Sequence, residues 1–211
     1  MREMENKKAV VIGAGLAGCE AAWQLAGRGI PVLLYEMKPY KHTAAHSMDG
    51  LAELVCSNSL KAERIESAAG LLKEEMSRLG SLLVPCAKEC RVPAGGALAV
   101  DREKFSAYIT EKLRSCPDLT ILTEEVTALP DASEKGYTIV ATGPLTADAL
   151  AADISEKTGG GLYFYDASAP IVSAESIDMS AAFTGDRYGK GSGDYINCPL
   201  TKEEYYAFVD A

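Results

Sequence analysis

A glycine-rich loop lies near the start of the chain, between an apolar run and a stretch of helix-forming residues. The loop reads Gly13-Ala14-Gly15-Leu16-Ala17-Gly18, after the apolar residues 9–12 and before a predicted helix over residues 19–26. A second apolar run, residues 31–35, ends in Glu36, roughly 20 residues after the glycines, as a dinucleotide-binding fingerprint requires. This order of strand, glycines, helix, strand and acid predicts an α/β fold with a Rossmann-like, parallel central sheet and a dinucleotide site at its edge.

Each glycine of the loop has an expected task. Gly13 permits the tight turn, Gly15 lets a pyrophosphate approach the backbone, and Gly18 lets the helix pack close to its strand. The helix N-terminus offers unpaired N–H groups and a partial positive charge to phosphates. Glu36 would accept hydrogen bonds from ribose hydroxyls and repel the 2′-phosphate of NADP, which favours FAD or NAD. A glycine-rich turn in an ordinary α/β unit is the alternative, and the complete fingerprint disfavours it.

Composition fits a globular protein of one large or two small domains. Of the 211 residues, 47% are hydrophobic and 24% are charged. No stretch approaches the ~18 apolar residues of a membrane span, and the N-terminus lacks the apolar segment of a signal peptide, so we expect a cytoplasmic protein. The six cysteines are scattered without a CxxC pair, which predicts free thiols and no zinc or other metal site.

The net charge of −9 argues against broad nucleic-acid binding. A polyanionic partner would need a local basic patch, and a solvated surface is the alternative role of the same side chains. The candidates for such a patch are Lys38, Lys41, His42, Lys61, Arg64, Arg187 and Lys190.

Hydrophobic periodicity and capping residues predict further helices and strands. The predicted helices cover residues 67–79, the stretch that follows Asp101 as N-cap, residues 146–157 and residues 202–209, the last opened by a Thr201/Glu204 capping box. The predicted strands cover residues 119–122, 126–129, 137–143 and, with a polar break, 163–172. Pro85 and Pro93 argue against a helix around Cys86 and Cys90.

The strand predicted over residues 137–143 is expected to be buried and to end in the small residues Thr142 and Gly143. Ligands bind at the carboxyl edge of a doubly wound sheet, so small residues there favour a bulky flavin. A plain strand terminus with a turn is the alternative. Residues 37–50 have no periodicity and predict a long functional loop beside the cofactor. The last helix stops after barely two turns without a C-cap signal, so we expect the front part of a longer protein.

Cys56 lies where an apolar run meets a polar Ser57-Asn58-Ser59 turn. The N–H groups of such a turn, together with the nearby Lys61, would stabilise a thiolate and make it a better nucleophile. A buried structural cysteine is the alternative. The other cysteines near helices, Cys19, Cys86, Cys90 and Cys116, are expected to be inert.

Several stretches resemble the bacterial folate- and FAD-dependent tRNA (uracil-5-)-methyltransferases, relatives of the glucose-inhibited-division-type tRNA-modifying flavoproteins. The resemblance runs from about residue 8 to the end of the chain. It is carried by residues 11–18, 51–60, 70–76, 92–102, 188–191 and 194–205.

The resemblance implies a reaction and a set of site residues. A methylene group from methylenetetrahydrofolate passes through N5 of reduced FAD to C5 of a T-loop uridine of tRNA, and NAD(P)H reduces the flavin. Cys56 corresponds to the family cysteine that takes part in catalysis. The residues expected to bind the cofactor are Gly13, Ala14, Gly15, Leu16, Ala17, Gly18, Glu36, Asp101, Arg102, Val126, Thr142 and Gly143.

The resemblance also assigns domains. Residues 1–200 would be the N-terminal portion of the FAD-binding domain without its C-terminal completing segment, and residues 201–211 would begin a helical insertion domain. Family members are longer, so this chain is expected not to methylate tRNA alone. Two alternatives stay open, a related tRNA wobble-uridine-modifying flavoprotein and a truncated, non-catalytic FAD- or NAD-binding module. The residues around Cys56 and residues 194–205 argue against the wobble enzyme.

Overall fold

The computed structural model describes residues 8–131, 136–160, 172–186 and 193–210. Its central sheet has four parallel strands, β1 (Ala9–Ile12), β2 (Val32–Glu36), β6 (Leu119–Thr123) and β7 (Thr138–Val140). They lie in the order β6-β2-β1-β7. The strand order therefore reverses between β1 and β7, and the α/β fold with a parallel central sheet is confirmed.

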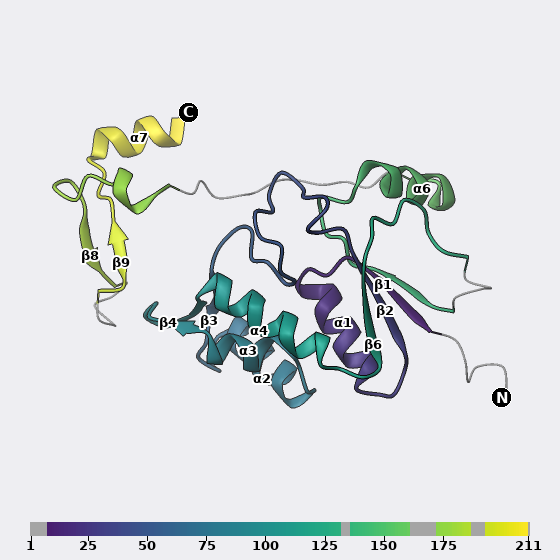
Figure 1. Cartoon of the computed structure of the whole chain (residues 1–211). Helices are drawn as coiled ribbons and strands as arrows, with labels where there is room; N and C mark the ends of the chain where they lie inside the picture. Colours follow the sequence, from purple (N-terminus) through teal and green to yellow (C-terminus); the bar gives the residue numbers. More distant parts are fainter. Residues whose placement is uncertain (1–7, 132–135, 161–171, 187–192, 211) are drawn as a thin grey trace.

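Helices cover both faces of this sheet (Figure 1). One face packs against α1 (Leu16–Ala26) and α4 (Arg102–Arg114), and its core includes Val11 of β1, Leu34 of β2 and Phe105 of α4. The other face packs against α6 (Asp148–Thr158), where Val10 and Ile12 of β1 contact Leu150. Alternate residues of β1 point to opposite faces, so a strand covered on both sides is apolar at every position.

A second, antiparallel sheet lies beside α4. It contains β3 (Ser59–Ala62), β5 (Ala97–Val100) and β4 (Arg91–Val92) in that order, and α2 (Ala68–Arg78) and α3 (Leu83–Glu89) pack near it. The expectation that no helix forms around Cys86 is wrong, because α3 carries Pro85 in its first turn. At that position the missing N–H would have no intrahelical acceptor in any case.

Two strand predictions need correction. β7 is an outer strand of its sheet, and Ile139 and Val140 are 38% and 41% exposed, so the strand is not buried as expected. Residues 126–129 form no strand. Instead, Val126 and Leu129 pack on the α6 face of the sheet, and the Leu129 amide donates to Asp153 Oδ2 at 2.7 Å. Periodicity detects an apolar segment but does not show whether that segment forms a strand of the sheet or packs on the face of the sheet.

The last described part contains the short 3-10 helix η1 (Ala174–Ser176), a hairpin of β8 (Phe183–Gly185) and β9 (Tyr195–Asn197), and α7 (Lys202–Asp210). It stands at one side of the molecule, away from the central sheet (Figure 1). The predicted capping box is confirmed, because the Thr201 amide donates to Glu204 Oε2 and the Glu204 amide to Thr201 Oγ1. The strand predicted over 163–172 falls almost wholly outside the described residues.

The remaining helix predictions are confirmed. Ser67 caps α2 and Asp101 caps α4, each through a side-chain oxygen that accepts an amide hydrogen from the first turn. Gly159 ends α6 in the left-handed conformation. Over the described ranges, none of the helices has the length and apolar character needed to cross a membrane.

Candidate functional site

A cavity of about 300 Å³ opens at the carboxyl ends of β1, β2 and β7, where the strand order reverses. This is the position at which doubly wound sheets bind ligands. Its wall contains the following predicted cofactor-binding residues: Gly13, Gly15, Leu16, Ala17, Glu36, Val126, Thr142 and Gly143.

The glycines of the loop have the geometry that their expected tasks require. Gly13 has a φ of 93°, and a Cβ there would lie 2.8 Å from the Ala141 carbonyl oxygen. A Cβ on Gly18 would overlap the Gly13 carbonyl oxygen, so Gly18 permits close packing without lining the cavity itself. A Cβ on Gly15 would meet no atom within 4 Å, which leaves space for a ligand against the backbone.

The N-terminus of α1 faces this space. Gly15 is the N-cap and supplies no side-chain acceptor, and the first turn of α1 carries no acidic residue. The first amides of a helix have no intrahelical acceptor and carry partial positive charge. This end of α1 therefore has the chemistry to bind a pyrophosphate.

Glu36 ends β2 and is 9% exposed. Its Oε2 accepts a hydrogen bond from the Ala14 amide at 2.9 Å, and its Oε1 accepts one from the Lys38 amide at 3.1 Å. An ionised carboxylate has about four lone-pair sites, so ribose hydroxyls can still donate to it. Ala14 thus contributes to the site by orienting Glu36 rather than by lining the cavity.

The opposite wall comes from the segment after β7. Thr142 Oγ1 lies 2.6 Å from Thr146 Oγ1, and Gly143 has a φ of 69° that favours glycine. The structure therefore brings Thr142 and Gly143 to the glycine-rich loop, although more than 120 residues separate them in the sequence.

Asp101 and Arg102 lie outside the lining of this cavity. Asp101 caps α4, with Oδ1 accepting from the Lys104 amide at 3.1 Å, and its own amide donates to the Cys90 carbonyl at 2.9 Å. Arg102 is the first residue of α4. A structural role explains the position of Asp101, and the cofactor contact of both residues stays a prediction.

Cys56 is exposed and directly follows Val55, which lines the cavity. The turn after it is fixed to β5, because Asn58 Nδ2 donates to the Val100 carbonyl and the Val100 amide donates to the Asn58 carbonyl. Burial instead raises the pKa of Cys19 to about 12 and that of Cys86 to about 11, which keeps both as thiols. Of these three cysteines, Cys56 alone is exposed, and it adjoins the cavity wall through Val55.

Lys38, His46 and Glu53 line the cavity but were not predicted as cofactor residues. The sequence signals for Lys38 and His46 were the long loop of residues 37–50 and, for Lys38, its place among the basic residues, whereas Glu53 lies in the stretch 51–60 that carries the resemblance. Thr43 Oγ1 lies 2.6 Å from His46 Nδ1. Burial and the charge of Lys38 lower the pKa of His46 and so favour its neutral form.

The basic residues proposed for a polyanion are mostly engaged elsewhere. Lys38 is neither solvated nor available to an anion, because it pairs with Glu53 at 3.2 Å and their side chains are 4% and 1% exposed. Lys41 pairs with Glu125, and His42 with Asp49. Lys61 and Arg64 are exposed, whereas Arg187 and Lys190 lie outside the described residues.

A parallel sheet with a glycine-rich loop, a helix N-terminus and an acid at its carboxyl edge defines the Rossmann-type α/β class, which takes dinucleotides at this position. Within that class, the chain belongs to the glucose inhibited division protein A family, whose model matches residues 8–211.

Two curated relatives are similar over nearly the whole chain. Both carry the name methylenetetrahydrofolate--tRNA-(uracil-5-)-methyltransferase TrmFO. The protein of Geobacter sulfurreducens is 59% identical over 202 residues, covering 95% of this chain and 46% of the relative. That of Geotalea uraniireducens is 60% identical over 209 residues, covering 99% and 47%. The chain thus spans about half the length of these relatives.

Among solved structures, Aquifex aeolicus GidA in its form II crystal is similar at 19% identity and a TM-score of 0.47. The match covers 60% of this chain and 21% of the GidA chain.

Proposed function

We propose that this chain supplies the FAD-binding part of a folate- and flavin-dependent tRNA (uracil-5-)-methyltransferase. The observation that carries the proposal is the 59% identity to a relative of that name over 95% of the chain. The cavity supports it, because most of the residues proposed to bind the dinucleotide line it, and the exposed Cys56 directly follows Val55 of its wall.

The lining of the cavity fits FAD. Its phosphates would lie at the N-terminus of α1, in the space that Gly15 leaves open. Glu36 would accept hydrogen bonds from the ribose, and Val126 would contact the adenine. Glu124 and Glu125 also line the cavity, and their carboxylates, with that of Glu36, would repel the additional phosphate of NADP.

The chain's own residues would bind the cofactor, and Cys56 would supply the reactive group beside it. When bound and reduced by NAD(P)H, FAD supplies the carrier for the one-carbon unit of methylenetetrahydrofolate. Cys56 is the proposed catalytic thiol at the cavity rim, and its reactive form would be the thiolate. The T-loop uridine of tRNA is the proposed acceptor at C5, and with tRNA as its substrate the protein is proposed to act in the cytoplasm.

The flavin part of the proposal is tested by titrating the purified chain with FAD and following flavin fluorescence and visible absorbance. Gly15→Ala should weaken FAD binding at least about tenfold, since its Cβ enters the proposed pyrophosphate space. Gly160→Ala is the matched control, because its Cβ also meets no atom within 4 Å but lies away from the cavity. Equal binding by the two variants would reject the pyrophosphate assignment.

The reaction is tested in a chimera, because the chain spans about half of its relatives. Residues 1–211 replace the matching part of the Geobacter sulfurreducens protein, which is incubated with tRNA, methylenetetrahydrofolate, FAD and NAD(P)H. We expect ribothymidine from the chimera and none from the 211-residue chain alone. Cys56→Ser should abolish the product and Cys116→Ser should keep it. Modification of a wobble uridine instead would favour the related tRNA-modifying flavoprotein.

A further inference from the structure

A closed circuit of hydrogen bonds joins the glycine-rich loop to the segment that leads to Cys56. The Ala14 amide donates to Glu36 Oε2 at 2.9 Å, and the Lys38 amide donates to Glu36 Oε1 at 3.1 Å. Lys38 Nζ then donates to Glu53 Oε2 at 3.2 Å. The Ala52 amide closes the circuit by donating to the Ala14 carbonyl at 2.8 Å.

The side chains of Lys38 and Glu53 are buried and well supplied with partners. Lys38 Nζ also donates to the Gly50 carbonyl at 2.6 Å, and Glu53 Oε1 accepts from the amides of Ser47 at 2.8 Å and Met48 at 3.2 Å. A buried ion pair often adds little net stability over an apolar pair of similar size. Its better attested use is to select one arrangement of the chain among several.

The arrangement selected here includes an unusual backbone conformation. Ala52 has a φ of 51°, which non-glycine residues adopt only when their surroundings impose it. Its neighbours impose it here, because Glu53 is tied to Lys38, and Ser106 of α4 donates to the Leu51 carbonyl at 2.6 Å. From Ala52 the chain runs through Val55 in the cavity wall to Cys56.

We propose that Lys38, through its buried pair with Glu53, is a positioning residue that holds Cys56 at the rim of the cofactor cavity. This inference rests on the proposed role of Cys56. Lys38 does not neutralise the cofactor phosphates, because its ammonium group is directed to Glu53 and the Gly50 carbonyl. Its effect on catalysis passes through the loop.

The first test needs no cofactor. Amide hydrogen exchange is compared between the wild-type chain and Lys38→Met, which removes the charge and keeps an apolar side chain of similar length. The Ala52 amide should exchange at least about tenfold faster in the variant, because the loop opens locally. The Val32 amide, which donates to the Asp118 carbonyl inside the main sheet, is the internal control and should not change. Lys38→Arg should restore protection, and unchanged exchange at Ala52 in Lys38→Met would overturn the inference.

A second test relates the pair to the cofactor. Alkylation of each cysteine by iodoacetamide is followed by peptide mass spectrometry, with and without FAD. In the wild type, FAD should slow alkylation of Cys56 about tenfold or more and leave the exposed Cys198 unchanged. In Lys38→Met, FAD should still bind while Cys56 loses most of this protection.

The two tests separate the inference from the proposed function. If FAD does not protect Cys56 in the wild type, the proposed role of Cys56 fails whatever Lys38 does. If FAD protects Cys56 equally in the wild type and in Lys38→Met, the positioning role fails and the proposed function stands. Should Lys38→Met not fold because Glu53 is left unpaired, both comparisons are made with Lys38→Met/Glu53→Met, which removes both charges of the pair.

Discussion

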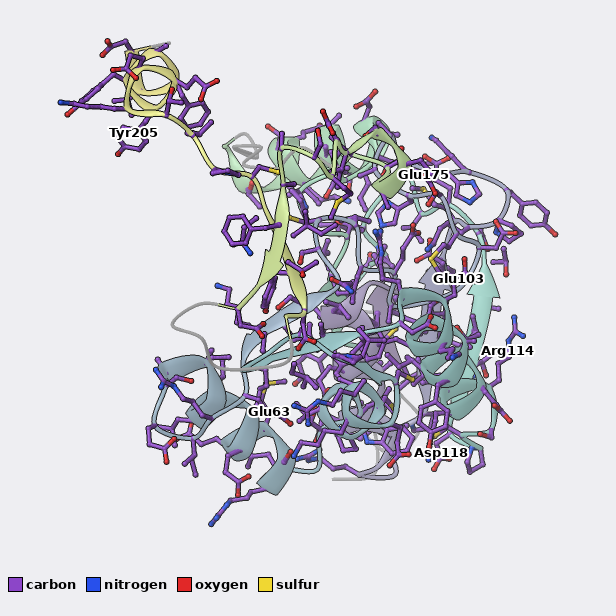
Figure 2. All side chains as sticks on the ribbon, turned by 90° about the vertical axis from the view of Figure 1, so that its left-hand side faces the viewer. Glu63, Glu103, Arg114, Asp118, Glu175 and Tyr205 are labelled. Atoms are coloured by element: carbon purple, nitrogen blue, oxygen red, sulfur yellow. The ribbon has the colours of Figure 1, made fainter. Side chains whose placement is uncertain are left out.

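The part of the molecule around the cavity, residues 8–131 and 136–160, differs from the last part, the described residues of 172–210, in how it uses apolar side chains. In the first part Phe105 and Ile109 are fully buried between α4 and the main sheet. In the second, none of the described residues is buried, and Phe183 and Phe208 are 56% and 75% exposed. Figure 2 shows Tyr205 on α7, standing clear of the main body.

The two parts are therefore held by interactions of different range. Around the cavity, residues distant in sequence pack and pair, as in the circuit from Ala14 to Glu53. In the second part the bonds are mostly local, such as the β8–β9 hairpin and the capping box of α7. Its described contacts with the rest of the chain include two at one turn, where Asp194 accepts from the Gly95 amide and Tyr195 donates to the Ala94 carbonyl. A substitution should affect global stability in the first part and only local order in the second.

The largest expected contrast is between two phenylalanines. Phe105→Ala leaves a cavity in the core and should lower the free energy of unfolding by about 3–5 kcal/mol. Phe208→Ala removes an exposed ring and should change it by less than about 0.5 kcal/mol. Urea unfolding followed by circular dichroism measures both. Similar losses would mean that α7 belongs to the same cooperative core.

The next contrast lies within the first part and separates stability from binding. Gly18→Ala forces a methyl group onto the Gly13 carbonyl and should cost about 2 kcal/mol in unfolding free energy. Gly15→Ala meets open space and should cost about 1 kcal/mol or less, because alanine is a poorer N-cap than glycine, yet it should weaken FAD binding. Unfolding and FAD titration of both variants would show whether the two glycines have these distinct tasks. A large loss of stability in Gly15→Ala would contradict the structure.

Two helix caps offer a smaller contrast. Ser67 accepts the Gly70 amide at the start of α2, and Thr201 accepts the Glu204 amide at the start of α7. Replacing either by alanine should cost about 1 kcal/mol of helix stability. For Ser67→Ala the loss should appear in the urea midpoint of the whole domain. For Thr201→Ala it should appear only as faster amide exchange within α7, and a shifted domain midpoint would contradict the comparison.

The smallest expected difference between the two parts is in how their stability depends on acid pH. Burial alone would raise the pKa of Glu53, but hydrogen bonds from the Ser47 amide and Lys38 hold it below 4.5. The folded state thus binds fewer protons than the unfolded state, so this stabilisation is present above pH 4.5 and is lost as the pH falls through the lower folded-state pKa. Glu53→Gln should flatten the acid limb of a urea-midpoint profile.

The hydrogen bond from the Thr201 amide likewise lowers the pKa of Glu204. Glu204 is fully exposed, so Glu204→Gln should remove the acid dependence of amide exchange in α7 and leave the acid limb of domain unfolding as it is. A flattened acid limb in this variant would show that the two parts are energetically coupled.

Local signals predicted much of the fold and eight of the residues that line the cavity. The glycine spacing, the apolar runs and the caps at Asp101 and Thr201 each depend on a few neighbouring residues, and the structure has them where expected. The predicted residues Thr142 and Gly143 do reach the glycine-rich loop. The burial of β7, the strand over 126–129 and the absence of a helix at Pro85 were wrong, because each depends on which element packs alongside.

The amino-acid sequence by itself determined the βαβ unit, its glycine-rich loop and the acid at Glu36, since these follow from backbone conformation and periodicity over short distances. Only the tertiary structure decided that Lys38 faces Glu53 rather than solvent, and that Val55, the neighbour of Cys56, lines the cavity. The physical reason is that the burial of a charge and its partner depends on contacts between segments that no local pattern encodes.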